Sequence, residues 1–151
     1  TDRSRGLGDV YKRQLINMLY VLDLIRTDDI AVRDTQFYLT KGQRRIVQEI
    51  YDTIRQDLSR DVSMAELESL YGMSSVSINK YFEIVYGDTV KRYMQSKRMA
   101  YAAKQLTGSN ISVADIALSV GYESQSKFGT VFKRKYGCTP LEYRRLGGET
   151  T

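Results

Sequence analysis

The sequence contains no histidine and a single cysteine in 151 residues. Because histidine is the commonest general base and a frequent metal ligand, its absence removes the usual routes to acid–base catalysis and metal binding. One cysteine, Cys138, cannot form an internal disulfide framework or a multi-cysteine metal site. No nucleophile–base pair or carboxylate cluster occurs at a useful spacing. We therefore predict that the chain is not an enzyme and that it carries no cofactor or metal.

Long apolar runs are also missing. No run approaches the roughly 20 residues that a membrane-spanning helix needs, and no secretory signal is visible. We therefore expect a cytoplasmic protein without a membrane partner. A hydrophobic content of 42% and a charged content of 27% are ordinary for a globular protein. The length suits one or two small domains with a modest core.

Residues 111–145 have the pattern of two short helices, a tight turn and a third helix that begins at Pro140. We expect Gly121 to end the first helix, because glycine adopts a positive φ without a Cβ penalty, and Ser124 to cap the second. A polar-faced helix after such a turn is typical of a helix-turn-helix motif. The expected apolar face of the first helix consists of Ile111, Ala114, Ile116, Ala117 and Val120. The second is expected to bury Phe128, Phe132, the stem of Lys135 and Tyr136 at helical spacing.

The same pattern occurs earlier in the chain, where residues 62–93 align with residues 111–143. The offset is 49 residues before the turn and 50 after it. Gly72 matches Gly121, and Ser74 matches Ser124. The one-residue slip lies in the turn, where insertions are tolerated. Two copies are too few for a solenoid, so we predict a duplicated unit that is used twice on one repetitive ligand.

Positive charge is concentrated in the second copy. The net charge of the chain is +5, but residues 91–151 contain eleven Lys/Arg and four Asp/Glu, a net charge of +7. Residues 33–90 contain seven Lys/Arg and nine Asp/Glu, a net charge of −2. A basic domain suits a polyanion, of which nucleic acid is the commonest, although solvated lysines give the same composition.

In these ordered motifs the chain resembles the DNA-binding region of the AraC/XylS family of bacterial transcription regulators, over roughly residues 41–145. The resemblance implies an all-α, homeodomain-like fold with two helix-turn-helix units joined by a long helix. It also implies sequence-specific binding of double-stranded DNA and regulation of transcription. In the second unit, the residues that show the resemblance are Ile116-Ala117, Val120-Gly121-Tyr122, residues 124–128, Phe132-Lys133, residues 136–140 and Tyr143-Arg144. The first unit carries it in Leu67, residues 72–74, Tyr81-Phe82, Gly87, Tyr93, Arg98 and Ala102.

A helix without glycine or proline is predicted between the two units, over residues 88–107. Twenty residues at about 1.5 Å each give roughly 30 Å, close to the ~34 Å between half-sites that lie one turn apart on B-DNA. A rigid helix of this length can place two recognition helices in adjacent major-groove segments. Arg98 falls on its apolar stripe, between Met94 and Ala102. We expect Arg98 to be partly buried and paired with a carboxylate of a neighbouring unit.

The side chains expected to contact bases lie on the outward faces of the two recognition helices. Asn79 and Gln125 can pair bidentately with adenine, and Lys80 can pair with guanine. The resemblance places base contacts at Ser75, Val76, Asn79 and Lys80 in the first unit, and at Gln125, Ser126 and Thr130 in the second. Phosphate contacts are expected from Lys127, Lys133 and Arg134, and from the helix N-termini at Ser63 and Ser112.

Two outward residues fit this interpretation poorly. Glu83 places a carboxylate on the expected DNA side, where it repels phosphate unless it accepts from a cytosine amine. Gly129 lies within a helix, where glycine costs about 1 kcal/mol; we expect it to allow close approach of the sugar–phosphate backbone. With its net charge of −2 and Glu83, the first unit is expected to bind DNA more weakly than the second.

The domain boundaries follow from these patterns. Residues 1–14 are interpreted as a non-native or disordered leader. Residues 15–40 are interpreted as the residual helix of a lost N-terminal domain, Leu15–Arg26, followed by a polar linker. The remaining divisions are a first unit over 41–87, which begins with an amphipathic helix at Lys41–Leu58, a linker helix over 88–107, a second unit over 108–146 and a disordered tail over 147–151.

Two other functions compete with DNA binding. An all-α protein-interaction module, with a partner such as RNA polymerase, predicts apolar outward faces, whereas the outward faces here are mostly polar. Single-stranded nucleic-acid binding requires exposed aromatic side chains, whereas the repeat places the tyrosines and phenylalanines on buried faces. We expect this chain to be monomeric, and the family resemblance suggests a dimer for a full-length protein.

Overall fold

A computed structural model describes residues 39–149, and the regular secondary structure of this range is all helix, without β-strands. Two helix-turn-helix units share one long helix, as the sequence predicts. The expected leader, the helix at Leu15–Arg26 and the polar linker up to residue 38 lie outside the described residues. Within residues 39–149, no helix is both long and apolar enough to cross a bilayer. The helices are α2 (Lys41–Gln56), α3 (Met64–Tyr71), α4 (Ser75–Tyr86), α5 (Val90–Gly108), α6 (Val113–Ser119), α7 (Gln125–Tyr136) and α8 (Pro140–Arg145).

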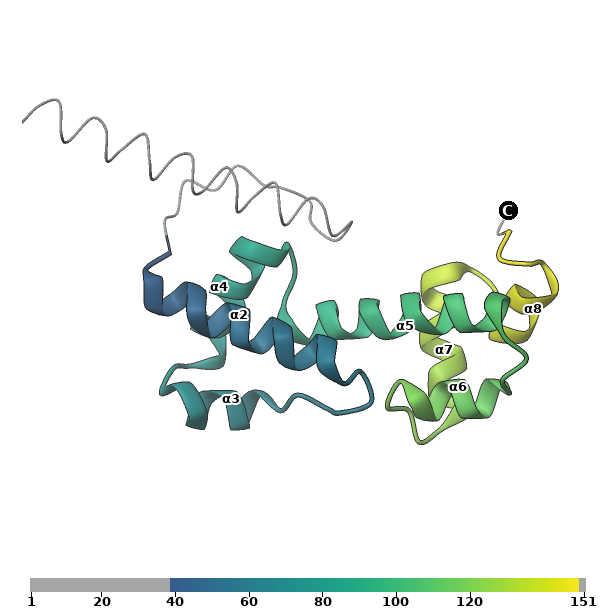
Figure 1. Cartoon of the computed structure of the whole chain (residues 1–151), viewed down its shortest axis with the longest axis horizontal. Coiled ribbons are helices and arrows are strands. Elements are labelled where there is room, and N and C mark those ends of the chain that lie inside the picture. The colour runs from purple at the N-terminus through teal and green to yellow at the C-terminus, as the bar shows by residue number, and fades with distance from the viewer. Residues whose placement is uncertain (1–38, 150–151) are drawn as a thin grey trace, which may run out of the picture.

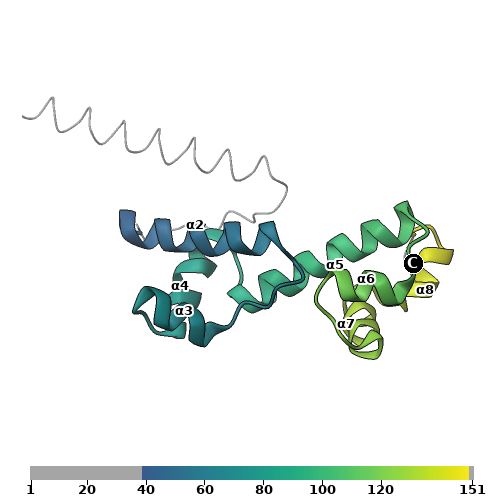
Figure 2. The ribbon, with the colours of Figure 1, turned by 60° about the horizontal axis from the view of Figure 1, so that its bottom comes forward.

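Helix α5 runs along the long axis of the molecule and connects the two units (Figure 1). Helices α2, α3 and α4 form one end, and α6, α7 and α8 form the other. In this view α3 and α6 lie along the same edge, and α4 and α7 rise from it in the same direction. Figure 2 shows the two units still separated along α5 after the molecule is turned. The two copies therefore follow one another along a common axis.

Each half of α5 belongs to a different hydrophobic core. The N-terminal half contributes Val90, Tyr93 and Met94 to the core of the first unit. The C-terminal half contributes residues such as Met99 and Leu106 to the core of the second. Helix α5 is therefore a structural part of both units and connects them.

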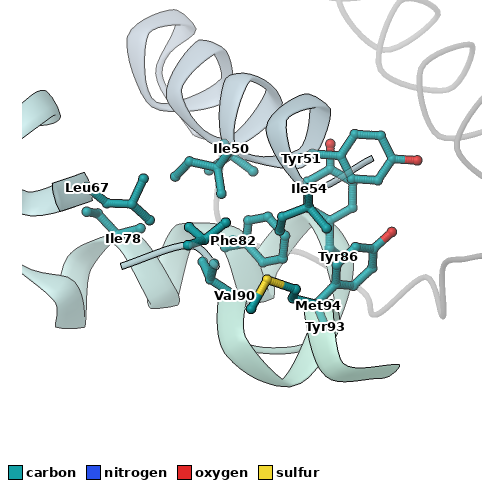
Figure 3. Close-up of a cluster of buried hydrophobic side chains, with 12 residues drawn as sticks. Ile50, Tyr51, Ile54, Leu67, Ile78, Phe82, Tyr86, Val90, Tyr93 and Met94 are labelled. Carbon is teal, nitrogen blue, oxygen red and sulfur yellow. The ribbon is translucent and has the colours of Figure 1, made fainter. Parts of the chain in front are cut away.

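Aromatic rings fill much of the first core (Figure 3). Tyr51 and Tyr86 stack with their ring centroids 4.4 Å apart, and Phe82 meets Tyr93 edge-on at 5.4 Å. These four rings are buried. Since stacking platforms for single-stranded nucleic acid must be exposed, the structure disfavours that function for these side chains.

Serine hydroxyls cap the helices where the sequence predicts them. Ser63, Ser74, Ser112 and Ser124 each accept a hydrogen bond from the backbone N–H three residues later. Such caps satisfy N–H groups that have no partner inside the helix. Helix α2 ends at Gln56, two residues before the predicted end at Leu58. The caps determine which side chains occupy the first turns of α4 and α7.

The apolar face predicted for α6 is partly wrong. Ile116, Ala117 and Val120 are buried, but Ile111 and Ala114 are exposed. Ile111 precedes the Ser112 cap, so the helical periodicity does not extend to it. Ala114 lies two residues before Ile116, which places it about 200° around the helix. The short helix therefore contacts the core through a narrower face than predicted.

The Lys135 side chain reaches from α7 to α5, where its Nζ donates to the backbone oxygen and the hydroxyl of Ser96 at 2.9 Å each. Its stem is therefore partly covered, although the residue as a whole is exposed. Within the predicted tail, residues 147–149 form a hydrogen-bonded turn. Gly148 donates its backbone N–H to the Tyr143 carbonyl at 3.1 Å, and Glu149 donates to that of Leu146 at 3.2 Å. Positive φ angles at Gly147 and Gly148 allow this turn.

Candidate nucleic-acid interface

The two recognition helices, α4 and α7, begin in the same way. Gly72 and Gly121 adopt φ angles of 61° and 81° in the preceding turns. Ser74 then accepts from the Ser77 N–H, and Ser124 accepts from the Lys127 N–H, at 3.3 Å each. Both helices run 12 residues and end at a glycine of positive φ. The two helices are therefore equivalent, because the same kinds of turn glycine, serine cap and terminal glycine set their beginnings and ends.

On α4, two of the predicted base-contacting side chains are exposed. Val76 is 77% exposed, and Lys80 is also exposed. Ser75 is half-buried, and its backbone N–H donates to Glu68 Oε1 at 2.5 Å. This hydrogen bond lowers the pKa of the Glu68 carboxyl from its ordinary value of 4.5. Glu68, which sequence reasoning missed, therefore adds a carboxylate to the N-terminus of α4, a favourable position for negative charge.

Asn79 does not face outward as predicted. It is half-buried, and its Oδ1 accepts a hydrogen bond from the Val90 N–H at 3.1 Å. Val90 is the first residue of α5, whose N–H has no partner within the helix. Bidentate pairing with adenine uses the Asn oxygen as acceptor and the Asn amide as donor, so it would require this bond to break. We therefore assign Asn79 the role of a cap for α5.

The second unit supports this role for Asn79. In the repeat alignment Asn79 corresponds to Gly129, and Val90 corresponds to Pro140. Pro140 begins α8 and has no N–H, so the residue at position 129 has no cap to supply. A Cβ added to Gly129 would meet nothing within 4 Å. Packing inside the described protein therefore does not require glycine at this position.

On α7, the three predicted base-contacting side chains are all exposed. Gln125 and Ser126 lie in the first turn, and Thr130 follows one turn later. The Thr130 hydroxyl donates to the Ser126 carbonyl at 3.0 Å, which leaves its methyl group and oxygen lone pairs available. These three side chains offer hydrogen-bond donors and acceptors to solvent.

The predicted phosphate contacts divide into two groups. Lys127, Lys133 and Arg134 are exposed on α7. The N-termini at Ser63 and Ser112 are different, because each is followed by an acidic residue in the first turn, Glu66 and Asp115 respectively. The Ser112 hydroxyl also donates to Asp115 Oδ2 at 2.7 Å. Since these carboxylates would repel a phosphate, the structure disfavours both helix N-termini as phosphate sites.

A cationic cluster that the sequence did not reveal lies between α5 and α7. Arg92, Arg134 and Lys135 line a shared groove, and Lys97 lies close enough to Lys135 for repulsion between them. Burial lowers the pKa of both lysines, and the charge of Lys135 lowers that of Lys97 further. The sequence shows the excess of positive charge after residue 91, but only the packing of α5 on α7 brings these cations together.

Comparison with known proteins gives consistent results. Residues 67–146 match a protein family described as "Helix-turn-helix domain". The chain is 29% identical over 98 residues to the HTH-type transcriptional activator RhaR of Mannheimia succiniciproducens, covering 65% of the chain and 36% of RhaR. It is 30% identical over 105 residues to the HTH-type transcriptional activator AarP of Providencia stuartii, covering 70% of the chain and 78% of AarP.

In fold, the chain is similar to the crystal structure of the DNA-binding domain of AdpA, a global transcriptional factor, in complex with a target DNA. The TM-score is 0.61 at 22% identity, over 66% of this chain and 90% of that one. The chain spans about a third of the length of several curated relatives that it matches, from 30% to 36%.

Proposed function

Because the chain belongs to the AraC-type helix-turn-helix family, we propose that it binds double-stranded DNA sequence-specifically and regulates transcription. In this proposal α4 and α7 enter adjacent major-groove segments of one duplex. The observation that carries it is a pair of equivalently capped helices joined by α5, which expose Val76 and Lys80 on α4 and Gln125, Ser126 and Thr130 on α7. Two comparisons support the same function: the similar AdpA domain was solved in complex with a target DNA, and RhaR and AarP are described as transcriptional activators.

Selection from random duplex DNA tests this proposal directly. The whole chain is incubated with a random duplex library, bound DNA is recovered over several rounds and the recovered DNA is sequenced. We expect two short conserved blocks about one helical turn apart, the spacing of successive half-sites on one face of the duplex. Recovery of unenriched sequence would contradict sequence-specific binding, and recovery of a single block would contradict the use of both helices.

The base contacts are assigned to exposed side chains on the two helices. Gln125 is placed against adenine, Lys80 against guanine, and Val76 and Thr130 against thymine methyl groups. The exposed Ser126 and the half-buried Ser75 complete the set at the helix N-termini. The second unit supplies the stronger binding, because residues 91–151 carry the net charge of +7.

Gln125→Ala and Lys133→Ala are expected to weaken DNA binding in different ways. Loss of a bidentate base contact by Gln125→Ala should relax specificity at one base pair by about 1–3 kcal/mol. Lys133→Ala removes a phosphate contact and should weaken binding equally on all sequences. Competition titrations with the selected site and with scrambled duplex distinguish the two effects. An equal loss on specific and scrambled DNA for Gln125→Ala would exclude it from the base contacts.

Gly129→Ala is expected to stabilise the protein while weakening its DNA binding. Alanine is favoured over glycine in a helix by about 1 kcal/mol, and no described atom obstructs the added methyl group. If the DNA backbone approaches this position, the methyl group displaces a contact, and loss of about 1.4 kcal/mol corresponds to tenfold weaker binding. Thermal unfolding and titration of the selected duplex measure both quantities. Increased stability with unchanged affinity would remove Gly129 from the interface.

The competing protein-interaction module is supported less well. Among the described residues, Val76 is the one exposed apolar side chain on α4, and the exposed side chains of α7 are polar or charged. The named relatives are transcriptional activators, which supports a regulator without enzymatic activity. Contact with RNA polymerase, the oligomeric state and the cytoplasmic location stay predictions.

A further inference from the structure

Arg98 lies where the two units meet, in the middle of α5. Among residues 39–149 it is the one charged residue that is buried, with 7% of its surface exposed. Its Nε donates to the Leu58 carbonyl at 2.7 Å, and its Nη2 donates to the Arg60 carbonyl at 3.1 Å. The carboxylate partner predicted from the sequence is therefore wrong. Backbone carbonyls of the loop between α2 and α3 bind the guanidinium instead, and they compensate for the loss of hydration on burial.

The same guanidinium also faces the second unit. Its carbon atom lies 5.8 Å from the centroid of the Tyr122 ring, within the range of a cation–π interaction. A Cβ built on Gly121 would lie 2.8 Å from Arg98 Nη2 and 2.5 Å from the Ser59 carbonyl oxygen. The α2–α3 loop of the first unit therefore lies directly against the turn that precedes recognition helix α7.

Arg144 provides an internal comparison within the second unit. It lies on α8, and its Nε donates to the Leu106 carbonyl at 3.0 Å while its Nη2 donates to the Ile111 carbonyl. Leu106 lies near the end of α5, as Leu58 follows the end of α2. Both arginines thus tie the first interhelical loop of a unit to the helix that follows its recognition helix. Arg98 differs because its guanidinium also contacts the other unit.

We propose that Arg98 is a positioning residue that locks the angle between the two helix-turn-helix units. The loop at residues 58–60, Arg98 and the turn at Gly121–Tyr122 form this lock. A fixed angle restricts tight binding to half-sites at one spacing, because both recognition helices must reach their grooves together. The restriction on half-site spacing rests on the proposed DNA-binding function, whereas the fixed angle is a property of the free protein.

The first experiment measures the lock without DNA. Spin labels are attached to Ser69→Cys on α3 and Ala114→Cys on α6, both exposed positions, in a Cys138→Ser background of the full chain. Pulsed dipolar spectroscopy then gives the distribution of distances between the units. We expect a narrow distribution for this labelled parent, a broad one for Arg98→Met, and a narrow one for the matched control Arg144→Met.

The second experiment measures the consequence on DNA. Binding is titrated on the selected site and on versions with five base pairs inserted between its blocks. For the unmodified chain, loss of simultaneous contact should weaken binding by about 100-fold. We expect the same insertion to lower the affinity of Arg98→Met by only about tenfold. A flexible junction would let its second unit still reach the displaced block, although at a lower effective concentration. Arg144→Met should retain the full spacing dependence.

The outcomes separate the lock from the DNA-binding function. An unchanged distance distribution and an unchanged spacing dependence for Arg98→Met would overturn the lock, as would equal broadening by Arg144→Met. If circular dichroism shows that Arg98→Met does not fold, Tyr122→Leu removes the contact to the second unit and keeps both carbonyl bonds. An unchanged distance distribution in that variant would also overturn the lock. Failure of the unmodified chain to bind any duplex would contradict the proposed function, while the distance measurement would still decide the lock.

Discussion

Gly121→Ala is expected to destabilise the protein much more than Gly72→Ala, although the two glycines are equivalent in the repeat. Both adopt positive φ angles, 81° and 61°, where a Cβ costs about 1–2 kcal/mol. At Gly72 an added Cβ meets nothing within 4 Å, so we expect that cost alone. At Gly121 the Cβ would lie 2.5 Å from the Ser59 carbonyl oxygen. Displacement of this backbone should add about 1–3 kcal/mol, the usual cost of overpacking.

Urea unfolding of the two variants, followed by circular dichroism, measures this difference. The pair is informative because both variants place the same methyl group at a positive φ in the turn before a recognition helix. The difference between their free energies of unfolding therefore reports the neighbouring loop. We also expect Gly121→Ala to broaden the distance distribution between the units, because the displaced loop carries the carbonyls that bind Arg98. Equal destabilisation by both variants would contradict the close contact between Ser59 and Gly121.

This pair of glycines shows what the repeat can and cannot predict. The alignment predicts that both positions are turns, because the requirement for positive φ is local and each copy meets it with glycine. The close approach of the Ser59 carbonyl to Gly121 is different, because it depends on how the second unit packs against the first. No local pattern distinguishes a glycine that is needed for its φ angle from one that is also needed for space.

Arg98 and Asn79 illustrate the same limit for polar side chains. Periodicity on α5 predicts that Arg98 is partly buried, and the structure buries it almost completely. Its partners could not be predicted, because carbonyl acceptors are present in every residue and only the folded loop selects those of Leu58 and Arg60. Asn79 has suitable chemistry for a base contact, but its oxygen binds Val90 instead. The exchange of Val90 for Pro140 between the two copies is the sequence signal that could have indicated this cap.

Helix boundaries and the second recognition helix were predicted more fully, for a physical reason. Serine caps and glycine turns act over three or four residues, so the sequence contains all the information that they need. Gln125, Ser126 and Thr130 were placed on an exposed face by helical spacing alone, and all three are exposed. Their contacts with bases stay proposals, because exposure is necessary for base recognition but does not demonstrate it.

DNA affinity is expected to fall by about a thousandfold between 50 and 200 mM monovalent salt. If about six phosphates are neutralised, log K should decrease with log salt concentration with a slope near −5, because each neutralised phosphate releases condensed counterions. Titrations of the selected duplex across this salt range measure the slope. Lys133→Ala should make the slope less steep by about one, whereas Gln125→Ala should leave it unchanged, since a base contact releases few counterions.

The salt series also tests which cations face the DNA. Arg92, Arg134 and Lys135 share the groove between α5 and α7, but Lys135 already donates to Ser96 at 2.9 Å and Arg92 lies 3.3 Å from the Asp88 carboxylate. Arg134→Ala should therefore change the slope more than Arg92→Ala or Lys135→Ala. A slope near zero for the unmodified chain would contradict phosphate contacts altogether. Equal changes for all three variants would mean that the whole groove, and not the outer edge of α7 alone, follows the DNA backbone.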